Sequence, residues 1–368
     1  MLSLLLGLAS LLLGSYPVEY NLQQKLYTNY TNSVPCVTCP IDIKLGISLR
    51  SILDVSEITG TIDLNIWLRH WWKDERLSWN LNDYNITSTT LFSNPELDSS
   101  IWTPDIKLIN TAEKPLDNLD LTDVIVYNTG DVIWSRPGII KATCEYNLYD
   151  FPYDKQECNF IFSSWSYNGF ILNLSHKNFA GCFDLSEMNL HKSWNIEDTQ
   201  CFTNSKIYNC CPEPYPYVTF KLDIKRNSHF FESMLITPLM LTGFFYVVSY
   251  FIPFDSGERI SFVTTVFLAI TVFLVYVYEI IPDSRENPLF ADILLSFVIF
   301  SFSNVTATIF ITKYYMVDEN KIKRTKSYIE SLNKKLKIPF SINVICAIIS
   351  FIIFITFTVL LNSIKTGV

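Results

Sequence analysis

Charge is missing from four long stretches of this 368-residue sequence: 233–254, 260–278, 293–312 and 338–364. A helix of roughly 20 uncharged residues crosses the ~30 Å hydrocarbon core of a bilayer, because each residue adds about 1.5 Å. The missing charge therefore predicts four membrane-spanning helices in contact with lipid.

Basic residues are in the minority, with 28 Lys and Arg against 36 Asp and Glu and a formal net charge of −8. An acidic exterior disfavours nucleic acid as a partner and favours cations nearby. The exception is segment 313–337, between the third and fourth spans, where basic residues outnumber acidic ones. That excess predicts a short cytoplasmic loop, and four crossings then leave both chain termini outside.

Histidine is scarce, with four residues in the chain, and His176 and His191 lack the spacing of paired metal ligands. We therefore expect no metal and no cofactor. Cysteine is plentiful, and eight of the nine precede the first span, which predicts disulfide bonds in an exported domain. Cys36 and Cys39 have the spacing of a redox site, but no strand–helix unit accompanies them. We expect a structural bridge there and no enzyme.

The remaining pattern divides the chain into segments. Residues 1–14 are apolar, lack basic residues and are too short to span, which is typical of a signal-peptide core. Residues 18–30 form an amphipathic pattern, and short alternating runs from 41 to 220 predict an antiparallel, immunoglobulin-like β-sandwich. The predicted fold is a β + α membrane protein: an extracellular β-sandwich with an N-terminal helix (15–228), three transmembrane helices (229–312), the basic loop (313–337), and a fourth helix with an extracellular end (338–368).

Three Asn-X-Ser/Thr triplets lie in the predicted extracellular domain, at Asn29, Asn85 and Asn173. This triplet is the acceptor for N-linked glycans in exported proteins. We expect all three to carry glycans.

The second uncharged span carries a distinct face. Its residues recur at the spacing of one side of an α-helix, with an acid near each end. Such a face could line water, or it could belong to a bundle helix whose hydroxyls bond its own carbonyls. The segment alone favours neither. The face consists of Glu258, Ser261, Thr265, Leu268, Val272, Val275 and Glu279.

Cys144 and Cys158 enclose the sequence Phe151-Pro152-Tyr153-Asp154. This arrangement resembles the signature loop of the Cys-loop, or pentameric ligand-gated ion channel, family. Other segments resemble the family's binding loops, the vicinal-cysteine loop of nicotinic acetylcholine receptor alpha subunits, and the cation-selective pore entrance. The resemblance covers about 18–362 and implies a homo- or hetero-pentamer with the second span around one pore, which favours the water-lining interpretation. These segments are 102–110, 164–167, 208–215 and 255–258.

The resemblance also implies an agonist site between subunits, where an aromatic cage holds a quaternary amine by dispersion and cation–π attraction. The principal side would supply Trp165, Tyr208 and Tyr215, beside a disulfide between Cys210 and Cys211. The neighbouring subunit would supply Trp67, near Ile133 and Ser135. The position usually held by a tyrosine is Ile109. Acetylcholine is therefore not singled out: choline, betaine or another small cation is as defensible, and this face could also have lost binding.

Gating and selectivity follow from the same resemblance. Glu57 would pair with Arg226. Removing one member of such a partly buried ion pair would cost several kcal/mol of stability. Phe151, Pro152 and Pro288 would complete the coupling layer. Five copies of Glu258 would attract sodium, potassium or calcium, and five of Leu268 would close the pore by dewetting. We expect a plasma-membrane location, with the postsynaptic membrane as one candidate. The rival hypothesis is a non-conducting accessory or trafficking subunit.

The resemblance accounts for four of the eight outer cysteines. Cys182 and Cys201 are outside the family's usual set. Pairing them, together with a bridge between Cys36 and Cys39, would use all eight.

Overall fold

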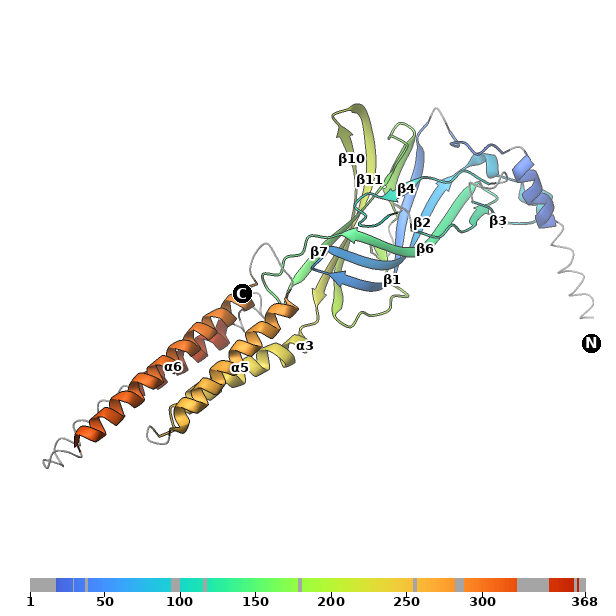
Figure 1. Cartoon of the computed structure of the whole chain (residues 1–368). Coiled ribbons are helices and arrows are strands. Elements are labelled where there is room, and N and C mark those ends of the chain that lie inside the picture. Colours follow the sequence, from blue (N-terminus) through green and yellow to red (C-terminus); the bar gives the residue numbers. More distant parts are fainter. Residues whose placement is uncertain are drawn as a thin grey trace, which may run out of the picture. The chain divides into compact units, whose positions relative to one another are not determined.

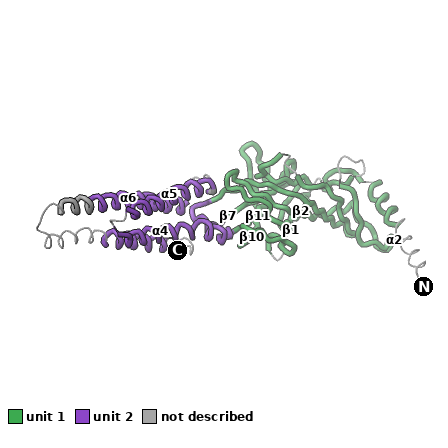
Figure 2. The backbone as a smooth tube through the Cα atoms, turned by 60° about the horizontal axis from the view of Figure 1, so that its bottom comes forward, with its two compact units in different colours: residues 1–146, 156–224 green, residues 147–155, 225–368 purple. Residues whose placement is uncertain are grey.

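The computed structural model describes residues 18–28, 30–36, 39–93, 100–114, 118–177, 181–253, 257–281, 288–322, 344–360 and 363. The chain forms two compact units (Figure 2): Met1–Tyr146 with Gln156–Ile224, and Asn147–Lys155 with Lys225–Val368. We call the first the strand unit and the second the helix unit (Figure 1). The predicted signal peptide and Asn29 lie outside the described residues.

The strand unit contains two sheets and an N-terminal helix at residues 18–28, with the short helices η1 (Glu75–Leu77) and α2 (Leu81–Tyr84). The larger sheet has the order β3-β5-β6-β2-β1-β8, with β9 also paired with β1. Its strands are β1 (Ile41–Ser56), β2 (Thr61–Lys73), β3 (Ser88–Leu91), β5 (Val124–Tyr127), β6 (Asp131–Thr143), β8 (Leu172–His176) and β9 (Phe183–Asp184). The smaller sheet has the order β10-β11-β7-β4: β10 (Trp194–Tyr208), β11 (Cys211–Arg226), β7 (Lys155–Ser164) and β4 (Ile106–Leu108).

The antiparallel sandwich predicted from sequence is confirmed, with one difference. Both β8 and β9 pair with β1 in parallel. Alternation explains the rest: β2 buries Ile62, Leu64 and Ile66 and directs the residues between them outward. Residues from both sheets form one core, whose aromatic rings meet edge to face at 5.7–6.4 Å. The rings belong to Phe160, Phe162, Phe183 and Phe220.

Three disulfide bonds are present: Cys36–Cys39, Cys144–Cys158 and Cys182–Cys201. The predicted bond between Cys210 and Cys211 is absent from the structure, in which both are free thiols. Cys210 lies in the turn after β10, whereas Cys211 begins β11. The two thiols nevertheless lie within hydrogen-bonding reach of each other, and this contact raises the pKa of Cys211.

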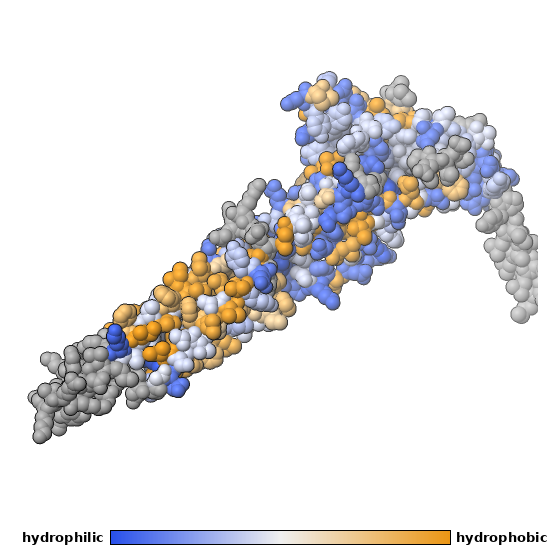
Figure 3. All heavy atoms as spheres, in the orientation of Figure 1, coloured by the Kyte–Doolittle hydropathy of each residue, from blue (hydrophilic) through white to orange (hydrophobic). Residues whose placement is uncertain are grey.

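The helix unit consists of α3 (His229–Phe231), the π-helix η2 (Glu232–Ile236), α4 (Thr237–Ser249), α5 (Glu258–Ile280), α6 (Leu289–Ile322) and the helix Val344–Leu360. Among the described residues, three helices are long and apolar enough to cross a membrane: His229–Ser249, Glu258–Glu279 and Leu289–Lys313. Of the fourth predicted span, the described part is the shorter helix Val344–Leu360. Hydrophobic side chains gather on the surface of this unit (Figure 3), as lipid contact requires.

The helices α4, α5 and α6 lie side by side (Figures 1 and 2). Gly243 of α4 permits a close approach, because an added Cβ would lie 2.9 Å from the ring of Phe354 and 3.1 Å from that of Phe297. Polar groups also join the helices: the Tyr250 hydroxyl donates to Asn304, and the Ser350 hydroxyl lies 3.1 Å from Tyr250. Small residues and interhelical hydrogen bonds are what hold membrane helices together.

Candidate functional site

Trp165 follows β7 and is 64% exposed. Asp105 fixes the turn that carries it: the Ser164 hydroxyl donates to Oδ1 at 2.5 Å, and the Ser166 N–H donates to Oδ2 at 2.8 Å. The Trp165 N–H also donates to the Asp105 carbonyl. The backbone is thus held on both sides of an indole that remains on the surface. A large aromatic ring left exposed on a fixed turn is more typical of a binding surface than of a core.

Tyr208 and Tyr215 lie on neighbouring strands of the smaller sheet, in which β11 is adjacent to β7. Tyr208 ends β10 and Tyr215 lies in β11, and their rings meet edge to face with centroids 5.4 Å apart. The Gly169 N–H donates to the Pro214 carbonyl at 2.6 Å and so joins the segment after Trp165 to β11. A Cβ on Gly169 would lie 2.9 Å from that oxygen, so only glycine fits without a shift. We call Trp165, Tyr208 and Tyr215 the Trp165 face.

The electrostatics of the Trp165 face are simple. Desolvation raises the pKa of Tyr215, and the nearby Cys211 and Glu213 raise it further. Its hydroxyl therefore stays neutral at physiological pH and can donate a hydrogen bond. The ammonium of Lys206, which is exposed, lies 5.0 Å from the Tyr208 ring centroid. Ile109, at the position of the family's tyrosine, is also exposed.

Trp67 lies on the outward face of β2, in the larger sheet. The guanidinium carbons of Arg50 and Arg69 lie 4.6 and 5.9 Å from its ring centroid. The register of β2 and β6 places Ser135 opposite Arg69 and Ile133 two residues further along the same face. We call Trp67 with Arg50 and Arg69 the Trp67 face. The two arginines were missed by sequence reasoning, although the alternation of β2 already puts Arg69 on the same side as Trp67.

All seven residues of the predicted pore face on α5 are exposed. The opposite side of the helix is buried against the chain's own helices, as Val263, Val266 and Ile270 show. The Thr265 hydroxyl donates to the Ser261 carbonyl at 2.8 Å, which the bundle interpretation also expects. The face is nevertheless directed away from α4 and α6. It is available to water, lipid or other subunits.

Asn147–Lys155 of the signature loop belong to the helix unit, whereas its two cysteines belong to the strand unit. Asp154 and Arg226 form a buried ion pair, with Arg226 Nε 2.7 Å from Oδ1 and Nη2 3.0 Å from Oδ2. Phe151 is buried, and its ring lies 5.0 Å from that of Phe231. Sequence reasoning missed Asp154 as a partner of Arg226. The signal was available in part, because Asp154 directly follows the apolar run Phe151-Pro152-Tyr153, and a carboxylate buried beside such residues needs a charged partner.

Pro288 and Glu57 are the remaining residues of the predicted coupling layer. Pro288 precedes α6, and the Leu289 N–H donates to the Tyr149 carbonyl of the signature loop at 3.0 Å. Glu57 lies in the strand unit and Arg226 in the helix unit, so their pairing stays a prediction. Asn85 and Asn173 are exposed, and their glycosylation also stays a prediction.

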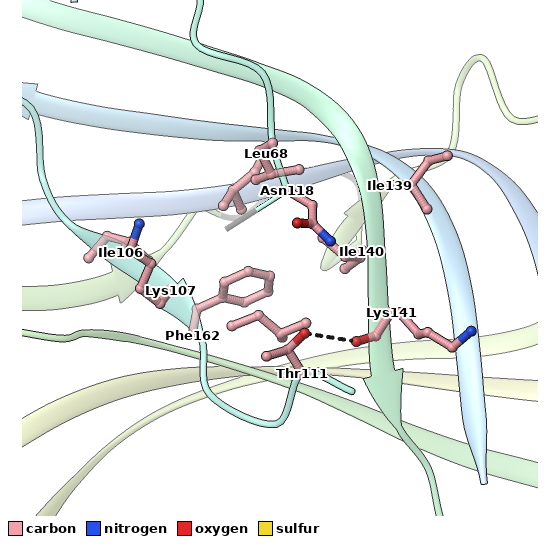
Figure 4. Close-up of a pocket in the computed structure, with 11 residues that line it drawn as sticks. Leu68, Ile106, Lys107, Thr111, Asn118, Ile139, Ile140, Lys141 and Phe162 are labelled. Carbon is pink, nitrogen blue, oxygen red and sulfur yellow. Dashed lines mark hydrogen bonds between the residues drawn. The ribbon is translucent and has the colours of Figure 1, made fainter. Parts of the chain in front are cut away.

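Two pockets lie elsewhere in the strand unit. A cavity of ≈ 20 Å³ has room for about one water (Figure 4) and is lined by apolar residues such as Leu68, Ile106 and Phe162. Of the described residues around it, none belongs to the predicted agonist site. An open pocket of ≈ 590 Å³ includes Trp71 and Ile133, next to the Trp67 face.

Comparison with known proteins decides the family. Residues 19–228 match the neurotransmitter-gated ion-channel ligand binding domain, and residues 235–340 match the neurotransmitter-gated ion-channel transmembrane region. This chain belongs to the neurotransmitter-gated ion-channel family. The resemblance inferred from the signature loop is thereby confirmed. The family consists of ion channels and not of enzymes, and this chain is a multi-pass protein of the plasma membrane.

Nicotinic receptor subunits are among its relatives. The chain is 37% identical over 283 residues to "Acetylcholine receptor subunit alpha-type acr-16" of Caenorhabditis elegans, covering 76% of this chain and 55% of that protein. It is 35% identical over 269 residues to "Neuronal acetylcholine receptor subunit alpha-9" of Gallus gallus, covering 72% and 54%. It is 33% identical over 287 residues to "Neuronal acetylcholine receptor subunit alpha-2" of Homo sapiens, covering 77% and 53%. The chain spans about half the length of these relatives.

Proposed function

We propose that this chain is a subunit of a pentameric, agonist-gated, cation-selective channel of the nicotinic type. The observation that carries the proposal is the continuous exposed face of α5, which has Glu258 at one end and Glu279 at the other. Five such faces around one axis would enclose a pathway with acidic rings at its mouths. Rings of carboxylates attract cations and repel anions, and a ring of Leu268 would close the pathway by dewetting.

The agonist would be a small quaternary amine bound between subunits. Such a ligand has no hydrogen to donate from its charged nitrogen, so aromatic faces must hold it, at about 0.5–2 kcal/mol for each well-placed ring. The exposed rings of Trp165 and Tyr208, with the half-buried ring of Tyr215 against that of Tyr208, support this role. Because Ile109 stands in place of a fourth ring on this side, acetylcholine, choline and betaine are all candidate agonists.

Coupling would run through the signature loop. Asp154, Arg226 and Phe151 belong to the helix unit together with α5 and α6, so a displacement of the loop would act directly on the helices. Removing one member of a buried ion pair costs roughly 3–5 kcal/mol, because the other charge is left uncompensated. We therefore assign Asp154 to the gating layer beside Arg226.

The test is a voltage-clamp recording of the full chain, expressed alone and with related alpha-type subunits, under acetylcholine, choline and betaine. We expect a current that reverses near the cation equilibrium potential in graded sodium chloride. Glu258→Ala should reduce both cation preference and conductance, since it removes five like charges from a narrow path. Surface pentamers that carry no current with any of the three amines would instead favour the accessory subunit.

A further inference from the structure

The ring of Trp67 already has cations of its own chain beside it. Arg69 shares the outward face of β2 with Trp67, because they are two residues apart. Arg50 comes from β1, at a register shift between Leu49 and Ser51 where it has no partner on β2. Such bulges re-aim a side chain. The result is one guanidinium carbon at 4.6 Å and another at 5.9 Å from the same ring centroid.

Carboxylates hold both arginines in this position. Arg69 Nη1 lies 3.4 Å from Asp184 Oδ2, and Arg50 forms an ion pair with Glu187. Asp184 is itself fixed, since it accepts from the hydroxyl of Ser48 at 3.1 Å and from that of Ser186 at 2.6 Å. Hydrogen bonding to Ser186 holds the pKa of Asp184 below its usual value. It therefore remains ionised at physiological pH.

The segment that carries these carboxylates is anchored at its base. Phe183 is buried in the aromatic core, and β9 pairs in parallel with β1. The adjacent Cys182 is bonded to Cys201 of β10. At the other end, the Asn189 N–H donates to the Arg50 carbonyl at 2.8 Å. The arginines are thus preorganised on the ring, so little conformational entropy opposes their stacking.

We propose that Arg50 and Arg69 are specificity-determining residues that keep a quaternary ammonium off Trp67. It follows that this chain supplies the principal side of the agonist site, and that a related subunit with an uncovered tryptophan supplies the complementary side. The inference rests on the proposed function. The face of one indole ring has room for few cations at a time. A quaternary ammonium would therefore have to displace an ion-paired guanidinium from the ring or bind beside it.

The arginines would exclude the ligand by occupying the ring face and not by long-range electrostatic repulsion. Two guanidiniums and two carboxylates sum to zero charge, so a distant cation is neither strongly attracted nor strongly repelled. Only a cation that must touch the ring meets the arginines directly. Neutral replacement of the arginines should therefore open the ring, whereas replacement of another cation on the same sheet face should not.

The experiment uses homopentamers of the full chain carrying Leu268→Thr, whose spontaneous current reports assembly without an agonist. The probe is tetramethylammonium, applied over a concentration series. We expect Arg50→Gln/Arg69→Gln to shift the response to about tenfold lower concentration, the amount that one well-placed ring contributes. Arg50→Lys/Arg69→Lys keeps both charges but replaces two stacked planes with hydrated, flexible ammoniums, so it should shift the curve in the same direction by a smaller factor.

Lys141→Gln is the matched control, because the Lys141 side chain is 26% exposed, as that of Arg69 is, and also pairs with an aspartate across β2 and β6. Identical curves for the parent and the double Gln variant would overturn the inference and leave the proposed function standing. A similar shift in Lys141→Gln would also overturn it. If the double variant does not assemble, Arg69→Gln alone must show a severalfold shift. Surface pentamers without any current, spontaneous or evoked, would refute the proposed function itself.

Discussion

Trp165 follows a strand of the smaller sheet, and Trp67 lies in a strand of the larger sheet. The two indoles differ in whether charged side chains of the same chain lie beside them. On the Trp165 face, the aspartate that fixes the turn bonds the backbone and leaves the indole 64% exposed. On the Trp67 face, the aspartate bonds an arginine that lies against the indole. The same residue types therefore leave one indole exposed and place two arginines beside the other. An aromatic residue in a binding motif does not by itself make an open site.

The Trp165 face also has a cation of the same chain near one ring, namely Lys206. Its ammonium lies 5.0 Å from the Tyr208 ring, but the side chain is exposed on β10. A lysine ammonium is a strongly hydrated charge on a flexible stem, whereas a paired guanidinium stacks as a fixed plane. An incoming cation can displace Lys206 at a lower free-energy cost than Arg50 or Arg69. The Trp165 face should therefore be the one that a quaternary amine occupies.

The largest expected effect is at Trp165. Trp165→Ala removes a fully presented ring and should raise the agonist concentration for half-maximal response about 30-fold, near the upper value for a desolvated cation–π contact. Dose–response curves in one defined pentamer measure this. Phe170→Ala is the matched control, because Phe170 is 65% exposed in the same segment. Equal effects of the two changes would mean that the Trp165 face is not the agonist site.

Ile109→Tyr should act in the opposite direction. It restores a ring and a hydroxyl on the Trp165 side, and we expect sensitivity to acetylcholine to rise about tenfold. Ile109 is 44% exposed, so the larger side chain requires no repacking of the core. Ile125→Tyr, at 42% exposure on the other sheet, is the control and should leave the curve unchanged. A silent Ile109→Tyr beside a severe Trp67→Ala would reverse the assignment of the two faces.

A smaller effect is expected at Gly169. Gly169→Ala places a Cβ 2.9 Å from the Pro214 carbonyl and must push the Trp165 turn away from β11. We expect a loss of agonist sensitivity of about threefold to fivefold, since a shift of a few tenths of an ångström weakens ring contacts without removing them. Gly181→Ala is the control, because its nearest neighbour would be a side-chain oxygen at 3.4 Å. Sensitivity unchanged in Gly169→Ala would show that this contact does not position the cage.

The smallest effect is expected from pH. The pKa of Tyr215 is raised by desolvation, so its neutral form is stable below the ordinary tyrosine pKa and is lost only at higher pH. The pKa of Asp184 is lowered, so its contribution to stability is present above the ordinary carboxyl pKa and is lost only as pH falls below it. Agonist sensitivity recorded between about pH 6 and 8 should therefore show no titration of Tyr215 or Asp184. A clear inflection that disappears in Tyr215→Phe or Asp184→Asn would contradict this.

Much of this molecule could be predicted because it depends on local periodicity and composition. The uncharged lengths predicted the membrane helices, the 3.6-residue spacing identified the exposed side of α5 residue by residue, and the even number of outer cysteines predicted disulfide bonds. These features follow from the geometry of one element at a time. The pattern of polar and apolar residues in one such element predicts which of its sides faces water, lipid or other parts of the protein.

Other features were decided only when distant segments met. Asp184 reaches β1 through a parallel pairing with Ser48, a contact across 136 residues that no repeat in the sequence announces. Arg50 reaches Trp67 through a shift in strand register, and Asp154 meets Arg226 across 72 residues. Periodicity along each element was enough to predict which aromatic side chains face outward. Which of these rings has a charged side chain of the same chain beside it depends on the register between strands. Register is set by tertiary packing and cannot be read from spacing along one strand.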